Sequence, residues 1–73
     1  MKATTGDQIL VDSERAGEPA RTGEILEIMS ATYGMRYRVR WDDGHESVIH
    51  PIGGSVHVRR RGDDLWQAPE DLH

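Results

Sequence analysis

The chain has 73 residues, of which 36% are hydrophobic, and 13 acidic against 9 basic side chains give it a formal net charge of −4. A chain of this length forms one small domain, whose core leaves little room for a cofactor pocket of the usual roughly 300–1,000 Å³. The sequence contains no cysteine, which excludes disulfides and a thiol nucleophile and fits a cytoplasmic location, and no apolar run is long enough to cross a membrane.

The first predicted element is a short strand, Gln8 to Val11, introduced by a Gly-Asp turn. A polar loop follows from Asp12 to Gly23, rich in charge and interrupted by glycine and proline. Glu24 to Met29 carries helix-forming residues, but this six-residue segment ends at the turn-like stretch Ser30 to Gly34. It is too short for a stable helix, and we therefore predict a second strand.

The third strand has the clearest pattern in the chain. Strict alternation puts Tyr37, Val39 and Trp41 on one face and arginines on the other, as in a half-buried strand. The dipeptide Asp43-Gly44 follows, and it is favoured in two-residue type I′ turns, where both central residues need positive φ. The segment up to His50 is therefore expected to fold back as a fourth strand.

A two-residue turn also predicts which residues face each other across this hairpin. Val48 then lies opposite Val39 and joins Tyr37, Val39 and Trp41 in the predicted core, while His50 lies inward opposite Tyr37. The arginines of the third strand meet no acidic residue of the fourth, since Arg38 faces Ile49 and Arg40 faces Ser47 in this register.

The remaining sequence predicts a last strand and a tail. Pro51 to Gly54 breaks the fourth strand, Val56 to Arg59 reads as the fifth, and Asp63 to Ala68 has room for one helical turn before Pro69. Five short strands with a tight hairpin predict a small antiparallel barrel over residues 1–61, with an acidic tail over residues 62–73.

Arginines provide the best candidate surface for an anion or a partner. Eight of the nine basic residues are arginine, whose planar guanidinium matches phosphate and carboxylate groups. An arginine row on a strand also simply keeps a sheet face soluble, and the net acidity of the chain is opposite to the charge of a dedicated nucleic-acid domain. The candidate residues are Arg36, Arg38, Arg40, Arg59, Arg60 and Arg61.

Aromatic residues and histidines offer weaker candidates. The chain has two Trp, two Tyr and no Phe, so Trp41 and Tyr37 are expected to fill the core and not to form an exposed stacking platform. Trp66 is expected to dock over an open end of the barrel. His45, His50 and His57 lack the close spacing and the cysteine partners of a zinc site, so we expect no metal and no cofactor. No catalytic motif is present, and no enzymatic activity is expected.

Several segments together resemble a bacterial family catalogued as domain of unknown function 1918. They are Ala3 to Val11, Gly17-Glu18-Pro19, Gly23 to Ile28, and the string from Tyr37 to Glu46 with Pro51 after it, so that the likeness spans about residues 1 to 58. The resemblance implies an SH3-like barrel and brings no activity, substrate or cofactor. The chain departs from its relatives at Ser47 to His50 and in its short acidic tail, where some relatives have a longer helix.

Two functions of different classes follow from these observations. The first is a monomeric, non-enzymatic barrel that binds a protein partner through the segments Asp12 to Gly23 and Ser30 to Met35 and one sheet face. The second is nucleic-acid binding through the arginine rows. A salt titration with a generic oligonucleotide separates them, because phosphate binding weakens steeply with salt.

Overall fold

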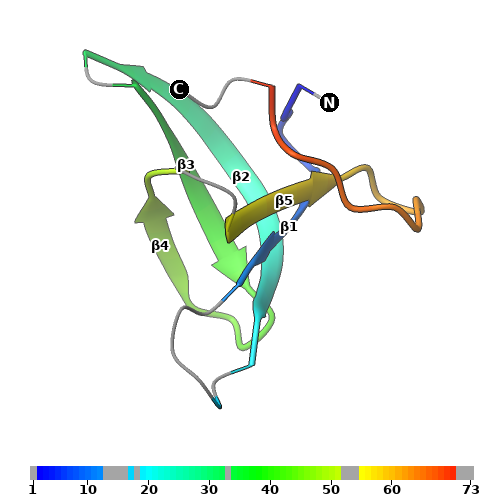
Figure 1. Cartoon of the computed structure of the whole chain (residues 1–73). Coiled ribbons are helices and arrows are strands. Elements are labelled where there is room, and N and C mark those ends of the chain that lie inside the picture. Colours follow the sequence, from blue (N-terminus) through cyan, green and yellow to red (C-terminus); the bar gives the residue numbers. More distant parts are fainter. Residues whose placement is uncertain (1, 13–16, 18, 33, 52–54, 71–73) are drawn as a thin grey trace.

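The protein is described by a computed structural model that covers residues 2–12, 17, 19–32, 34–51 and 55–70. The described strands, drawn in Figure 1, form one antiparallel sheet in the order β4-β3-β2-β1-β5. This is the predicted all-β architecture, a small SH3-like barrel whose two edge strands are β4 and β5. The strands are β1 (Gln8–Val11), β2 (Arg21–Ala31), β3 (Gly34–Trp41), β4 (Glu46–Ile49) and β5 (Val56–Arg59).

β2 is the longest strand and connects the two parts of the sheet, because it pairs with β1 near its start and with β3 along most of its length. It extends beyond the six residues predicted from sequence, and it curves across the whole sheet in Figure 1. The pairing with β3 shifts between Ile25 and Glu27, so Leu26 is the extra residue of a bulge. The bulge lets Ile25 and Ile28 both pack against the core although they are three positions apart.

The core lies inside the curved sheet and includes the inward side chains of β3, which are buried as their alternation predicts. Gly23 pairs with Ile9 on one side and Trp41 on the other. A Cβ atom at this position would lie 2.6 Å from the carbonyl oxygen of Arg40, so only glycine fits where the three strands meet. The buried hydrophobic residues are Ala3, Ile9, Ile25, Tyr37, Val39, Trp41, Val56 and Val58.

A buried carboxylate holds the N-terminal turn against this core. Asp7 is 4% exposed, and its Oδ2 accepts hydrogen bonds from the Thr4 amide at 2.9 Å and the Thr4 hydroxyl at 3.1 Å. Its backbone carbonyl accepts from the Ile25 amide at 2.9 Å. A guanidinium nitrogen of Arg60 lies 3.7 Å from Asp7 Oδ1. The charge of this carboxylate is therefore compensated within the fold, as burial of a charged group requires.

The hairpin between β3 and β4 forms, but the prediction of its turn was wrong. The Trp41 amide donates to the His45 carbonyl at 2.7 Å, and the Gly44 amide donates to the Trp41 carbonyl at 2.9 Å. Gly44 has φ +90°, while no described non-glycine residue has positive φ. The loop is thus a three-residue turn that ends in a left-handed glycine, not a type I′ turn, which needs positive φ at Asp43 as well.

One extra loop residue shifts the register of the hairpin by one position. Tyr37 pairs with Ile49, and Val39 with Ser47. Two predictions fail for this reason: Val48 is not a core residue, since it is 51% exposed, and His50 is not inward but exposed. The shift also sets Glu46 opposite Arg40, where the prediction had a serine.

The C-terminal residues form an extended tail. Residues 62–70 contain no helical turn. Gln67 instead forms a single antiparallel bridge with Val58 of β5, and the Trp66 ring lies half-buried under the Arg59 guanidinium, 4.3 Å from the ring centroid. None of the described residues forms a helix that could cross a lipid bilayer.

Candidate functional site

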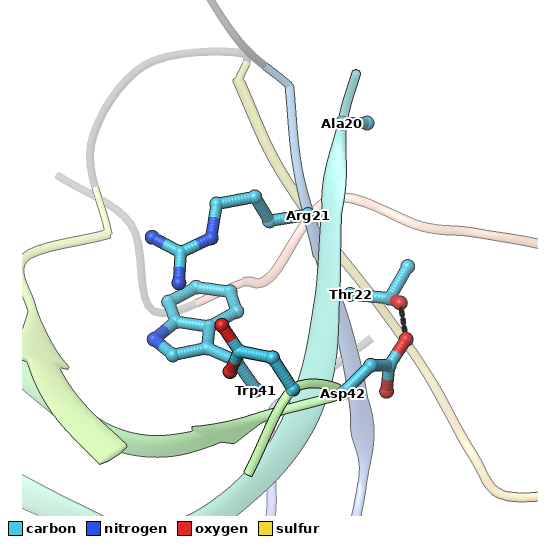
Figure 2. Close-up of a pocket in the computed structure, with 6 residues that line it drawn as sticks. Ala20, Arg21, Thr22, Trp41 and Asp42 are labelled. Atoms are coloured by element: carbon cyan, nitrogen blue, oxygen red, sulfur yellow. Dashed lines mark hydrogen bonds between the residues drawn. The ribbon is translucent and has the colours of Figure 1, made fainter. Parts of the chain in front are cut away.

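A hollow of about 220 Å³ lies where the start of β2 meets the end of β3. Figure 2 shows the Arg21 side chain extending over the indole of Trp41, with Thr22 directed toward Asp42. β2 brings Arg21 and Thr22 to this place, and β3 with its loop brings the aromatic ring and two carboxylates. The lining residues are Ala20, Arg21, Thr22, Trp41, Asp42 and Asp43.

The centre of the hollow is a cation resting on an aromatic face. The guanidinium carbon of Arg21 lies 4.2 Å from the centroid of the Trp41 ring, well within the roughly 6 Å at which a cation is attracted to the ring quadrupole. The orientation of the Trp41 ring is fixed by a hydrogen bond, because its Nε1–H donates to the Ser47 hydroxyl of β4 at 2.7 Å. Trp41 is only 5% exposed, whereas Arg21 is exposed, so the arginine is the member of the pair that faces solvent.

The two carboxylates of the loop are fixed by hydrogen bonds. Asp42 accepts from the Thr22 hydroxyl, which ties the loop to β2. Asp43 accepts from the His45 amide at 3.0 Å, and its second oxygen lies 3.1 Å from His45 Nδ1. The hydrogen bond from the His45 backbone lowers the pKa of Asp43 the most; charge interactions with the His45 ring and with Arg21 lower it further. Asp43 therefore stays ionised well below neutral pH.

These features allow recognition of a cation. The hollow is smaller than the roughly 300–1,000 Å³ sites that enclose small molecules, so it suits a single side chain better than a metabolite. Its lining offers one aromatic face and two carboxylates against one cationic residue. A guanidinium or ammonium group finds its usual partners here, an aromatic face and carboxylate oxygens.

Two of the six arginines of the predicted surface form ion pairs with glutamates of β2. Arg40 lies 3.0 Å from Glu24, and Arg38 lies 3.8 Å from Glu27. The bulge at Leu26 makes both contacts possible, because it turns both glutamates to the arginine side of the sheet. Arg36 has no ion-pair partner among the described residues and is exposed.

The second group of predicted arginines lies on a different strand and is also engaged. β5 is separated from β3 by β2 and β1 in the sheet order, so the two groups do not lie on neighbouring strands. Arg59 donates to the side chain of Gln8 at 2.7 Å and stacks on Trp66. Arg60 faces the buried Asp7 and donates to the Thr4 hydroxyl at 3.2 Å. Arg61 is exposed and unpaired within the described part of the chain.

The loops and histidines occupy other places. In the Asp12 to Gly23 segment, residues 13–16 and 18 lie outside the described residues and residues 21–23 belong to β2. The Ser30 to Met35 segment is mainly strand, since Ser30 pairs with Met35. Each of two histidines contacts one carboxylate: His45 meets Asp43, and His57 meets Asp12 at 3.2 Å. Among the residues that the structure describes, no three such side chains gather to hold a metal ion.

Sequence reasoning missed Arg21 and Asp42 and assigned Asp43 only to a turn. Arg21 lies at the boundary between a polar loop and a strand, where no periodicity indicates a role. The signal that was available is indirect: a buried tryptophan next to two acidic residues marks a place where a cation from elsewhere in the chain will be attracted.

Comparison with known proteins places the chain in a family. The model of the family described as domain of unknown function (DUF1918) matches residues 1–58. The chain therefore belongs to this family, as its sequence resemblance indicated. No curated protein and no solved structure matches it.

Proposed function

We propose that this member of the family is a non-enzymatic binding module that recognises a basic segment of a partner protein at the hollow around Trp41, in the cytoplasm. The observation that carries the proposal is the Arg21 guanidinium 4.2 Å from the Trp41 ring centroid, because it marks the indole face as a cation site. An incoming arginine or lysine side chain takes the place of Arg21 and meets the carboxylates of Asp42 and Asp43.

The exchange is energetically accessible. A cation–π contact whose cation is exposed to solvent contributes about 0.5–1 kcal/mol. Arg21 is such a cation, so a ligand cation with further contacts around the hollow can replace it. The net charge of −4 favours a basic partner over an acidic one. The cysteine-free chain is compatible with the reducing cytoplasm.

Nucleic-acid binding through the arginines is the less favoured alternative. The contacts of Arg38, Arg40 and Arg60 with carboxylates reduce the positive charge available to phosphates. Binding to a generic oligonucleotide that weakens steeply with salt would support this alternative over the partner-protein function.

The test is a titration with the blocked tripeptide Gly-Arg-Gly, followed by the NMR resonance of the Trp41 indole N–H. Arg21→Ala frees the ring from its internal competitor, so the peptide should bind about two- to fivefold more tightly than to the wild type. Asp43→Asn keeps the oxygen that accepts from His45 but removes the charge, and it should weaken binding.

The controls address charge and specificity. Arg61→Ala makes the same change of net charge away from the hollow and should leave the affinity unchanged. The blocked tripeptide Gly-Gln-Gly has no cation and should not shift the indole resonance. Equal shifts with both peptides, or none with Gly-Arg-Gly in the Arg21→Ala variant, would refute the proposal.

A further inference from the structure

The two edges of the sheet differ in how they are covered. The outer edge of β5 is occupied by the tail, since the Val58 and Gln67 amides each donate to the other residue's carbonyl at 2.8 Å. The outer edge of β4 has no such partner in the described part of the chain, where β4 pairs only with β3. An uncovered edge strand is a template for another strand.

The hydrogen-bonding groups of this edge follow from the register. The Trp41 amide bonds to the His45 carbonyl, and bonded pairs alternate with non-bonded pairs along an antiparallel ladder. Every second residue of β4 therefore turns its N–H and C=O away from β3. These residues are Glu46 and Val48, and His50 continues the alternation just beyond the strand.

In one register, the outward-facing residues of β4 are complementary to the same residues of a second copy of the chain. When two copies of β4 pair antiparallel about Val48, each Val48 meets its counterpart and each Glu46 faces His50 of the second copy. Val48 is 51% exposed and is one of two large hydrophobic residues exposed among the described ones, so its burial is favourable. The imidazole is a donor for the carboxylate. A register centred on Glu46 would instead oppose two carboxylates, which is unfavourable.

We infer that the β4 edge binds the β4 edge of a second copy of this chain, antiparallel and centred on Val48. The three facing pairs exchange about six backbone hydrogen bonds and continue the sheet from one copy into the other. A single short strand buries less surface than the roughly 1,200–2,000 Å² of stable interfaces, so the dimer forms in a weak, concentration-dependent equilibrium. This interface is separate from the hollow at Trp41 and does not depend on the proposed function.

Charge-reversal variants test the register directly. Glu46→Lys sets a lysine opposite His50, and His50→Glu sets two glutamates opposite each other, so each variant alone should have a dissociation constant about two- to thirtyfold higher than the wild type. A mixture of the two variants restores opposite charges at both ends of the interface. Equilibrium sedimentation up to 1 mM measures the self-association of each chain.

The mixing experiment separates this interface from any other. The Val48 amide of ¹⁵N-labelled Glu46→Lys protein should shift when unlabelled His50→Glu protein is added, and should stay in place when more unlabelled Glu46→Lys protein is added. Asp64→Lys is the control, since it makes the same charge change on the exposed tail and should self-associate as the wild type does. Val48→Lys should abolish association. A wild-type chain that stays monomeric at 1 mM, or a dimer that tolerates all three β4 changes, would overturn the inference.

Discussion

Trp41 is a core residue that also lines the hollow. Its removal deletes a large buried ring and leaves the Ser47 hydroxyl without its indole partner. We expect Trp41→Ala to lower the free energy of unfolding by about 3–5 kcal/mol, a large share of the roughly 5–15 kcal/mol typical of whole domains. Urea denaturation followed by circular dichroism measures this change.

The matched control is the other tryptophan. Trp66 lies half-buried on the tail with Arg59 on its face, so Trp66→Ala should cost only about 1 kcal/mol. If Trp41→Ala unfolds at the wild-type urea concentration, the ring is not part of the core and the description of the hollow must change.

Individual residues also mark where sequence reasoning reaches its limit. The burial of Tyr37 and Val39 follows from alternation, because side chains of a strand point to opposite faces by geometry alone. The position of Arg21 over an indole depends on two segments twenty residues apart in the chain. Such a contact is decided by the twist and pairing of strands, which a local pattern does not contain.

At the scale of the element, the β3–β4 loop decides the register. Gly44 has φ +90° and open space around the position of a Cβ atom. A larger residue there is therefore destabilising because of the backbone conformation and not because of a steric clash. Gly44→Val should destabilise the protein by about 1–2 kcal/mol or more, because a β-branched residue disfavours the left-handed region. Thermal unfolding monitored by circular dichroism provides the measurement.

The control for this loop is Gly44→Asn, because asparagine tolerates positive φ better than other residues. It should lose clearly less stability than the valine variant. Equal losses for both would mean that Gly44 is needed for a reason other than its φ angle.

The same loop explains why the elements were predicted better than their register. β1 and β5 have the bounds expected from their sequence, and the β3–β4 hairpin was expected from its alternation and its Asp-Gly dipeptide. That dipeptide fits both two- and three-residue loops, and local residue preferences do not choose between them. One residue of difference was enough to move Val48 from the expected core to the surface.

At the scale of the whole molecule, the tail protects one edge of the sheet and thereby limits association to the other. The Gln67 amide donates to the Val58 carbonyl, and proline at this position lacks that donor. Gln67→Pro should therefore speed hydrogen exchange at the Val58 amide and lower the free energy of unfolding by about 0.5–1.5 kcal/mol. Gln67→Ala keeps the backbone donor and should behave as the wild type, since the glutamine side chain is exposed.

The Gln67→Pro variant should also self-associate more strongly than the wild type, because both edges of its sheet then offer unpaired backbone groups. Unchanged exchange at Val58 would show that the tail does not cover β5 in solution.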